Sequence, residues 1–94
     1  MSGAELEAAL LEELRLRSRL NALVHERAEA IVEAEKLEAR AGLPGAAAGE
    51  LGDVAGRWRA VAERVTREIE EHRTALRAQE ATLARLRAPG GEPA

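Results

Sequence analysis

The chain has 94 residues, with 14 basic and 17 acidic side chains and a formal net charge of −3. Trp58 is its only residue of the Phe, Tyr and Trp class, and it has no cysteine, which argues against an aromatic globular core and excludes disulfides and thiolate sites. Ala, Glu, Leu and Arg, all strong helix formers, dominate, so the sequence predicts an all-α protein. A chain this short buries only a modest share of its surface alone, so a partner often completes its core.

The first helix is predicted over about residues 3–41. Ser2 and Glu5 have the S-x-x-E spacing of a capping box, in which two side chains satisfy backbone amides at a helix start. At the other end, Gly42 suits a left-handed cap, Leu43 is able to fold back onto the helix, and Pro44 cannot continue it. These residues set both ends of the predicted helix.

Apolar residues of this helix recur in alternating steps of three and four, the heptad spacing of a helix that packs along another helix. We call such a line of packing residues the seam. The predicted seam of the first helix is Leu16, Leu20, Leu23, Ala30, Ala34, Leu37 and Ala41. Leu6, Leu10 and Leu14 lie on a neighbouring face, whereas Leu11 and Val32 lie clear of the seam, so a single partner helix would leave these last two in water.

Residues 42–52, rich in Gly and small side chains, are predicted to form a turn, followed by a second helix over about 53–87 with Asp53 as its N-cap and a flexible tail over 88–94. The predicted seam of the second helix is Leu51, Val54, Trp58, Val61, Val65, Ile69, His72, Leu76, Gln79, Leu83 and Leu86. The two consecutive four-residue steps from Val61 to Ile69 predict a stutter, a local interruption of the heptad.

Two helices of similar length joined by a short turn predict one domain over residues 1–94, an antiparallel coiled-coil hairpin that completes a four-helix or larger bundle with a partner. The residues predicted to pack the hairpin near its turn are Leu37, Leu43, Trp58, Val61, Val65 and Ile69. The residues predicted to contact a partner are Leu6, Leu10, Leu11, Leu14, Leu16, Leu20, Leu23, Val32, Leu76, Leu83 and Leu86.

The run Leu20-x-x-Leu23-Val24-x-x-Arg27, followed by Lys36, resembles the long first helix of the small helical chorismate mutases over about twenty residues. That resemblance implies a small all-helical enzyme. The family's I-D-x-I-D run is replaced by Glu13, Leu14, Leu16 and Arg17, its catalytic lysine falls on Glu38, and an earlier arginine falls on Leu10. A site for a dianion needs those cations, so we expect the chain not to be an enzyme.

Trp58 near the start of the second helix, in a chain of about this length, resembles the WXG100 family of secreted helical hairpins. The tripeptide here is Trp58-Arg59-Ala60, without the family's glycine, and the chain has no Tyr for that family's C-terminal export signal. The resemblance implies a secreted hairpin, which is the alternative function to an adaptor.

Metal and nucleic-acid sites are not expected. Ferritin-like helices use Glu-x-x-His, but Ile69 stands three residues before His72, and Ala22 three before His25. We expect no metal or other cofactor. The arginines of the second helix alternate with acids and lack stacking aromatics, so we expect no nucleic-acid partner. No apolar run suits a membrane span, and the first residues are acidic where a signal peptide is basic, so we expect a cytoplasmic or nuclear protein.

Three polar residues, His72 and Gln79 on the seam and Asn21 beside it, either select a register or partner or are simply tolerated there. The sequence thus predicts a non-enzymatic coiled-coil interaction module, a structural or adaptor subunit. Its protein partner is either a second copy or another helical subunit, and both remain open.

Overall fold

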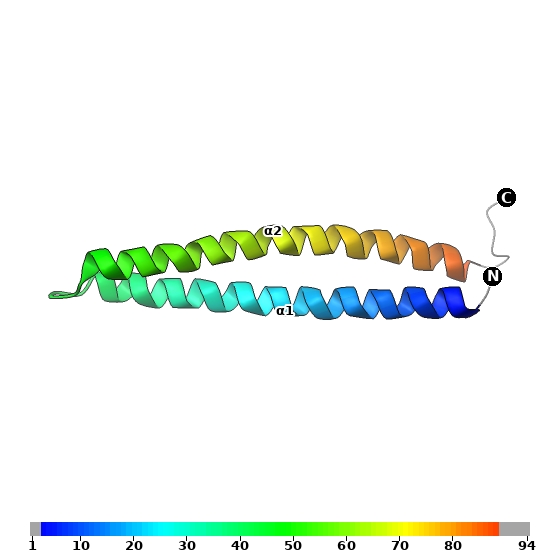
Figure 1. Ribbon diagram of the computed structural model, residues 1–94, viewed down its shortest axis with the longest axis horizontal. Coiled ribbons are helices and arrows are strands. Elements are labelled where there is room, and N and C mark those ends of the chain that lie inside the picture. Colours follow the sequence, from blue (N-terminus) through cyan, green and yellow to red (C-terminus); the bar gives the residue numbers. More distant parts are fainter. Residues whose placement is uncertain (1–2, 89–94) are drawn as a thin grey trace. The chain divides into compact units, whose positions relative to one another are not determined.

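The computed structural model describes residues 3–88. Within this range the chain forms two long α-helices, α1 (Gly3–Ala41) and α2 (Ala48–Arg87), and no strand (Figure 1). The predicted all-α class and the bounds of the first helix are confirmed. Ser2 of the predicted capping box and residues 89–94 of the predicted tail lie outside the described residues.

Contacts between residues divide the chain into two compact units, each containing part of both helices. Unit 1 comprises Met1–Asn21 and Glu70–Ala94, and unit 2 comprises Ala22–Ile69. Within unit 2 the end of α1 and the start of α2 lie side by side and antiparallel, joined by a turn (Figure 1). Unit 2 is therefore a helical hairpin in itself.

The turn of unit 2 is built by Leu43, Pro44, Gly45 and Ala46. The Ala46 N–H donates to the Leu43 carbonyl at 3.2 Å, and Gly45 has φ +80°. Proline at the second position and a positive-φ glycine at the third are the signature of a type II β-turn. The left-handed glycine is thus Gly45, and the prediction for Gly42 is wrong, because the Leu43 N–H instead bonds the Arg40 carbonyl at 3.1 Å and tightens the last turn of α1.

Helix α2 starts at Ala48, five residues earlier than the predicted Asp53. The Leu51 N–H donates to the Ala47 carbonyl at 3.0 Å, so the first helical hydrogen bond forms within the alanine run. Alanine has the highest helix propensity of all residues, which lets α2 begin without waiting for a polar cap. Residues 42–47 alone connect the helices.

The seam of unit 2 combines small and large apolar side chains. Leu23, Val65 and Ile69 are 0% exposed and are the largest fully buried side chains among those described. The buried alanines that accompany them are Ala30, Ala34, Ala55 and Ala62. Half-buried Leu37 and Trp58 extend this seam toward the turn.

The predicted stutter in α2 is wrong. Ala55 and Ala62 are buried, whereas Val54 is 37% exposed and Val61 only half-buried. Positions 55, 58, 62, 65 and 69 keep the alternating three- and four-residue steps, so the heptad continues without interruption. The prediction preferred the larger valines, but position around the helix determines which side chain faces α1.

Leu43, predicted to pack with Trp58, is 61% exposed. It is the first residue of the β-turn, where its carbonyl accepts the bond from the Ala46 N–H. This position holds its side chain away from the seam and corrects the expected contact.

In unit 1 the seam contains leucines together with a polar residue. Ala9, Leu16, Leu76 and Leu83 are buried there. Gln79 is half-buried, and its side-chain Nε2 donates to the Ala9 carbonyl at 3.0 Å. Gln79 therefore contributes a specific hydrogen bond across the two helical segments of this unit.

Candidate functional site

The residues predicted to contact a partner fall into three environments. Leu16, Leu23, Leu76 and Leu83 are buried inside their own units. Leu6, Leu10, Leu20 and Leu86 are half-buried. Leu11, Leu14 and Val32 are exposed and are the members of the set that another protein reaches without rearrangement. Their role in partner binding stays a prediction.

Unit 1 presents two exposed leucines on α1, Leu11 at 62% and Leu14 at 61%. Residues three apart are neighbours on a helix surface, so these two form one apolar patch, here called the outer leucine pair. Leu16 is buried two residues after Leu14, and two residues correspond to more than half a helical turn. The outer leucine pair therefore lies on the side of α1 away from the seam of unit 1.

Unit 2 has a groove of about 530 Å³ between α1 and α2, here called the unit 2 groove. It is lined by His25, Glu26, Ala28, Glu29, Val32, Glu33 and Lys36 from α1 and by Trp58 and Val61 from α2. The half-buried ring of Trp58 gives this groove the one large flat apolar surface that the sequence offers.

The two edges of the unit 2 groove differ in chemistry. The α1 edge carries Glu26, Glu29 and Glu33, whose spacing of three and four residues keeps them on one side of the helix. Lys36 is the one cation lining the groove, and its Nζ lies 3.3 Å from Glu33 Oε2. The α2 edge is apolar where it lines the groove. A ligand with an apolar face and basic flanks suits this pattern.

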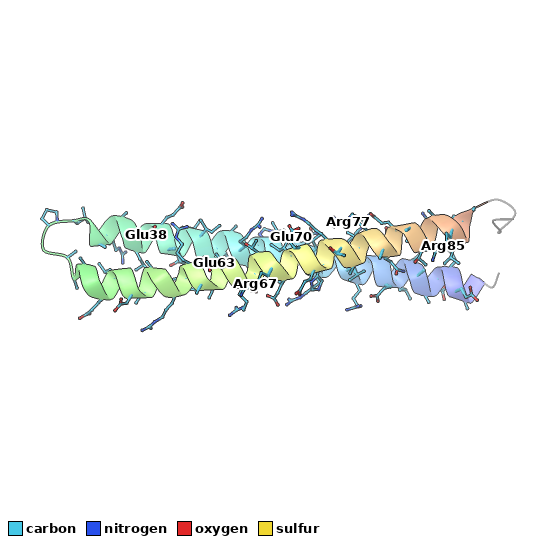
Figure 2. All side chains as sticks on the ribbon, turned by 90° about the horizontal axis from the view of Figure 1, so that it is seen from above. Glu38, Glu63, Arg67, Glu70, Arg77 and Arg85 are labelled. Carbon is cyan, nitrogen blue, oxygen red and sulfur yellow. The ribbon has the colours of Figure 1, made fainter. Side chains whose placement is uncertain are left out.

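A second hollow of unit 2, of about 430 Å³, is lined by Ile31, Arg59, Ala62, Glu63, Thr66 and Arg67. Beside it, Arg59 donates to both carboxylate oxygens of Glu38, with Nε at 3.1 Å and Nη2 at 2.7 Å. This hydrogen bond lowers the pKa of Glu38 and raises the pKa of Arg59. Figure 2 shows Glu38 on α1 and Glu63 and Arg67 projecting from α2. Of the charged side chains that line this hollow, Arg59 is thus engaged by a neighbouring carboxylate.

Several charged groups of unit 1 are engaged at its surface. Arg17 Nη2 lies 2.6 Å from Glu80 Oε2 and 3.2 Å from Glu13 Oε2, which links the two helical segments of the unit. On α1, the hydrogen bond from Arg15 lowers the pKa of the Glu12 carboxyl.

The three predicted polar selectors lie in different environments. Gln79 makes its bond across unit 1, whereas Asn21 is exposed and His72 is half-buried. Gln79 thus makes a specific contact between the helical segments. The selection of a partner by any of the three residues stays a prediction.

Metal ligation finds no support in residues 3–88, where no group of three or more His, Cys, Asp or Glu side chains is placed to hold an ion. His25 lines the unit 2 groove, with glutamates along the same helix edge. Over the same residues, neither helix contains an apolar stretch that meets the length and hydropathy of a bilayer span.

The acidic edge of the unit 2 groove was not foreseen from the sequence. Glu26, Glu29 and Glu33 recur at helical spacing, and that recurrence is the signal that was available. Its significance depends on Trp58 and Val61 lying across the groove, which needs the pairing of the two helices.

Comparison with known proteins assigns no family to the chain: no family model matches it, and no curated protein or solved structure matches it significantly. The similarities to chorismate mutases and to WXG100 proteins therefore remain interpretations of short motifs.

Proposed function

We propose that this protein is a non-enzymatic helical interaction module, an adaptor or structural subunit that completes a bundle of four or more helices with a protein partner. The observation that carries the proposal is the outer leucine pair, with Leu11 and Leu14 more than 60% exposed on the side of α1 away from the seam. Adjacent exposed apolar side chains mark protein-binding surfaces more often than isolated ones do.

The energetics support a covered state for this pair. Burying one leucine side chain that was in water contributes about 1.5–3 kcal/mol. Covering Leu11 and Leu14 together therefore contributes several kcal/mol toward association, before the entropy lost on binding is subtracted. The helix partner that covers them needs only an apolar stripe, because bundles are assembled from such stripes.

The charged side chains favour the same proposal. In the unit 2 groove they line an open hollow between two helices and flank apolar side chains. That arrangement suits the polar rim of a protein interface, in which an apolar centre contributes the affinity and surrounding charges contribute specificity.

The test replaces the outer leucine pair by charge, Leu11→Glu with Leu14→Glu. We expect the wild-type chain to assemble into a species heavier than its 10.1 kDa and the double variant to have a lower mass than wild type at the same concentration, measured by light scattering over a concentration series. The matched control is Leu43→Glu, which charges a leucine of equal exposure in the turn and should leave the mass unchanged.

Circular dichroism at each concentration verifies that the helices persist, since both leucines are exposed and their replacement leaves the seam intact. A wild-type chain that stays at the mass of one molecule with full helicity at every concentration would exclude a second copy as the partner and leave another helical protein to cover the outer leucine pair. An assembly whose mass the double variant leaves unchanged would contradict the proposal.

A further inference from the structure

We infer that the unit 2 groove binds the unit 2 groove of a second copy of this chain, with α1 of each copy packed against α2 of the other. The inference rests on the proposed function and names the partner for one of its surfaces. It is carried by three features of unit 2: an apolar strip, opposite charges on its two helices, and the register between them.

The apolar strip of the groove lies mainly on α2, and Val32 forms its outer margin on α1, because Val32 stands two residues from each of the buried Ala30 and Ala34. Val32 of α1 is 46% exposed, and Val61 and Trp58 of α2 are half-buried. Val54, 37% exposed, precedes Val61 by seven residues and so lies on the same face of α2. These side chains are only partly covered by their own chain, and the strip they form is a suitable centre for a helix-to-helix interface.

Opposite charges accompany the groove on its two helices. Glu26, Glu29 and Glu33 follow the α1 edge. On α2, Arg57 and Arg64 stand four residues before and three after Val61, which places both just outside the apolar α2 edge. Both arginines are exposed, and neither forms an ion pair with another residue of the described range. A face with one acidic and one basic edge is complementary to itself under a two-fold axis.

The register follows from the antiparallel course of the helices. Val32 and Val61 line the same groove from opposite helices. Glu29 precedes Val32 by three residues, and Arg64 follows Val61 by three residues. Because the two helices run in opposite directions, both residues are displaced by about 4.5 Å in the same direction along the groove. In the pairing that sets Val32 level with Val61 of the second copy, a two-fold axis parallel to the helices places Glu29 opposite Arg64 of the second copy.

Lys36 is the one cation on the α1 edge, and it comes level with Arg57 of the second copy by the same counting. Its ammonium group is already bonded to Glu33 at 3.3 Å, which offsets the repulsion between the two cations. A basic helix from a different protein would also fit the acidic edge. It would leave Arg57 and Arg64 without counterparts, and this favours the second copy.

The test exchanges charges between the edges. Glu29→Arg and Arg64→Glu are made separately, so that each variant meets two like-charge pairs when it associates with itself. In a mixed dimer both contacts are again opposite in sign: the arginine introduced by Glu29→Arg faces the glutamate introduced by Arg64→Glu, and the native Glu29 and Arg64 face each other. We expect each variant alone to dissociate about ten-fold more readily than wild type, and the equimolar mixture to recover most of that loss.

Sedimentation over a concentration series measures the dissociation constants. The matched control is Arg67→Glu, the same charge change on a residue that lines the other hollow of unit 2 and projects from α2 (Figure 2). It should leave association unchanged. Circular dichroism should show equal helicity for all variants, because the substituted positions are exposed.

The outcomes separate the two proposals. If wild type associates and loses association on charging Leu11 and Leu14, but the mixture binds no better than its components, the second-copy inference is overturned and the proposed function stands. If wild type remains a single molecule at every concentration, the second-copy inference is overturned, and the proposed function then requires a different helical protein as the partner. The inference is supported if each variant by itself associates more weakly than wild type and the equimolar mixture recovers the association.

Discussion

Units 1 and 2 are made from the same two helices, yet they bury different side chains. In unit 2 alanines occupy much of the seam, and Leu23, Val65 and Ile69 beside them are fully buried. In unit 1 the seam is richer in leucine, but Leu16 and Leu76 retain 7% and 9% of their exposure, and other leucines are half-buried or exposed. The unit with the larger side chains is thus the less completely buried one.

The difference teaches that a seam needs small residues as much as large ones. Small side chains at a helix contact let the two backbones approach, so the large side chains between them are covered from both sides. Leucines on every face of a helix have more apolar surface than one antiparallel neighbour covers. The large seam side chains of unit 2 are consequently more completely buried, whereas unit 1 leaves apolar surface exposed for a partner to cover.

The largest effect is expected where unit 2 is tightest. Ala34 is 0% exposed, and Ala34→Leu adds three carbon atoms where no space is left. We expect a loss of about 1–3 kcal/mol in the free energy of unfolding, measured by urea denaturation, because an overpacked core forces side chains out of their preferred rotamers. The control Ala39→Leu, on an exposed position of the same helix, should change stability by less than about 0.5 kcal/mol. Equal effects at the two positions would contradict the account of the alanine seam.

A smaller effect is expected in unit 1 at Gln79. Gln79→Ala removes the 3.0 Å hydrogen bond to the Ala9 carbonyl and should lower the free energy of unfolding by about 1 kcal/mol, the usual net value for a neutral hydrogen bond. Asn21→Ala, an amide truncation on an exposed position of α1, serves as the control and should be near neutral. If Gln79→Ala stabilised the chain instead, the polar seam residue would be a cost to unit 1 rather than a support.

The smallest effect concerns pH and unit 2. Arg59 holds the pKa of Glu38 below its ordinary value of 4.5. Because the folded pKa is the lower one, this pair stabilises the fold above pH 4.5, and its contribution disappears as the pH falls through the pKa of folded Glu38. NMR titration of the Glu38 carboxyl should show a return toward 4.5 in Arg59→Gln. An unchanged titration midpoint would mean that the bidentate pair does not persist in solution.

Much of the fold was predictable because it depends on local sequence. The bounds of α1 followed from helix formers and from the stop at residues 42–44, and they are confirmed. Leu11 and Val32 were predicted to lie off the seam, and both are exposed. These predictions need only the geometry of a single helix.

The errors came where two segments had to be placed together. Hydrophobicity ranked Val54 and Val61 above Ala55 and Ala62, although only the position relative to α1 decides which pair is buried. The unit 2 groove was not predicted for the same reason, since its acidic and apolar edges come from different helices. In the turn, the left-handed glycine was predicted at Gly42 but is Gly45. Pro44 occupies the second position of a type II turn, and this turn requires a positive φ at the third position, which is Gly45.

The short turn at Leu43–Ala46 has a consequence for the order of folding. The Arg59–Glu38 pair of unit 2 spans 21 residues of chain, whereas the Arg17–Glu80 pair of unit 1 spans 63. Closing a loop three times longer costs about 1 kcal/mol more in chain entropy, and local contacts form faster. Unit 2 should therefore assemble first from the turn, and the chain ends should meet last. During that interval the leucines of unit 1 have no intramolecular cover, so a partner present during synthesis meets them before the chain has closed on itself.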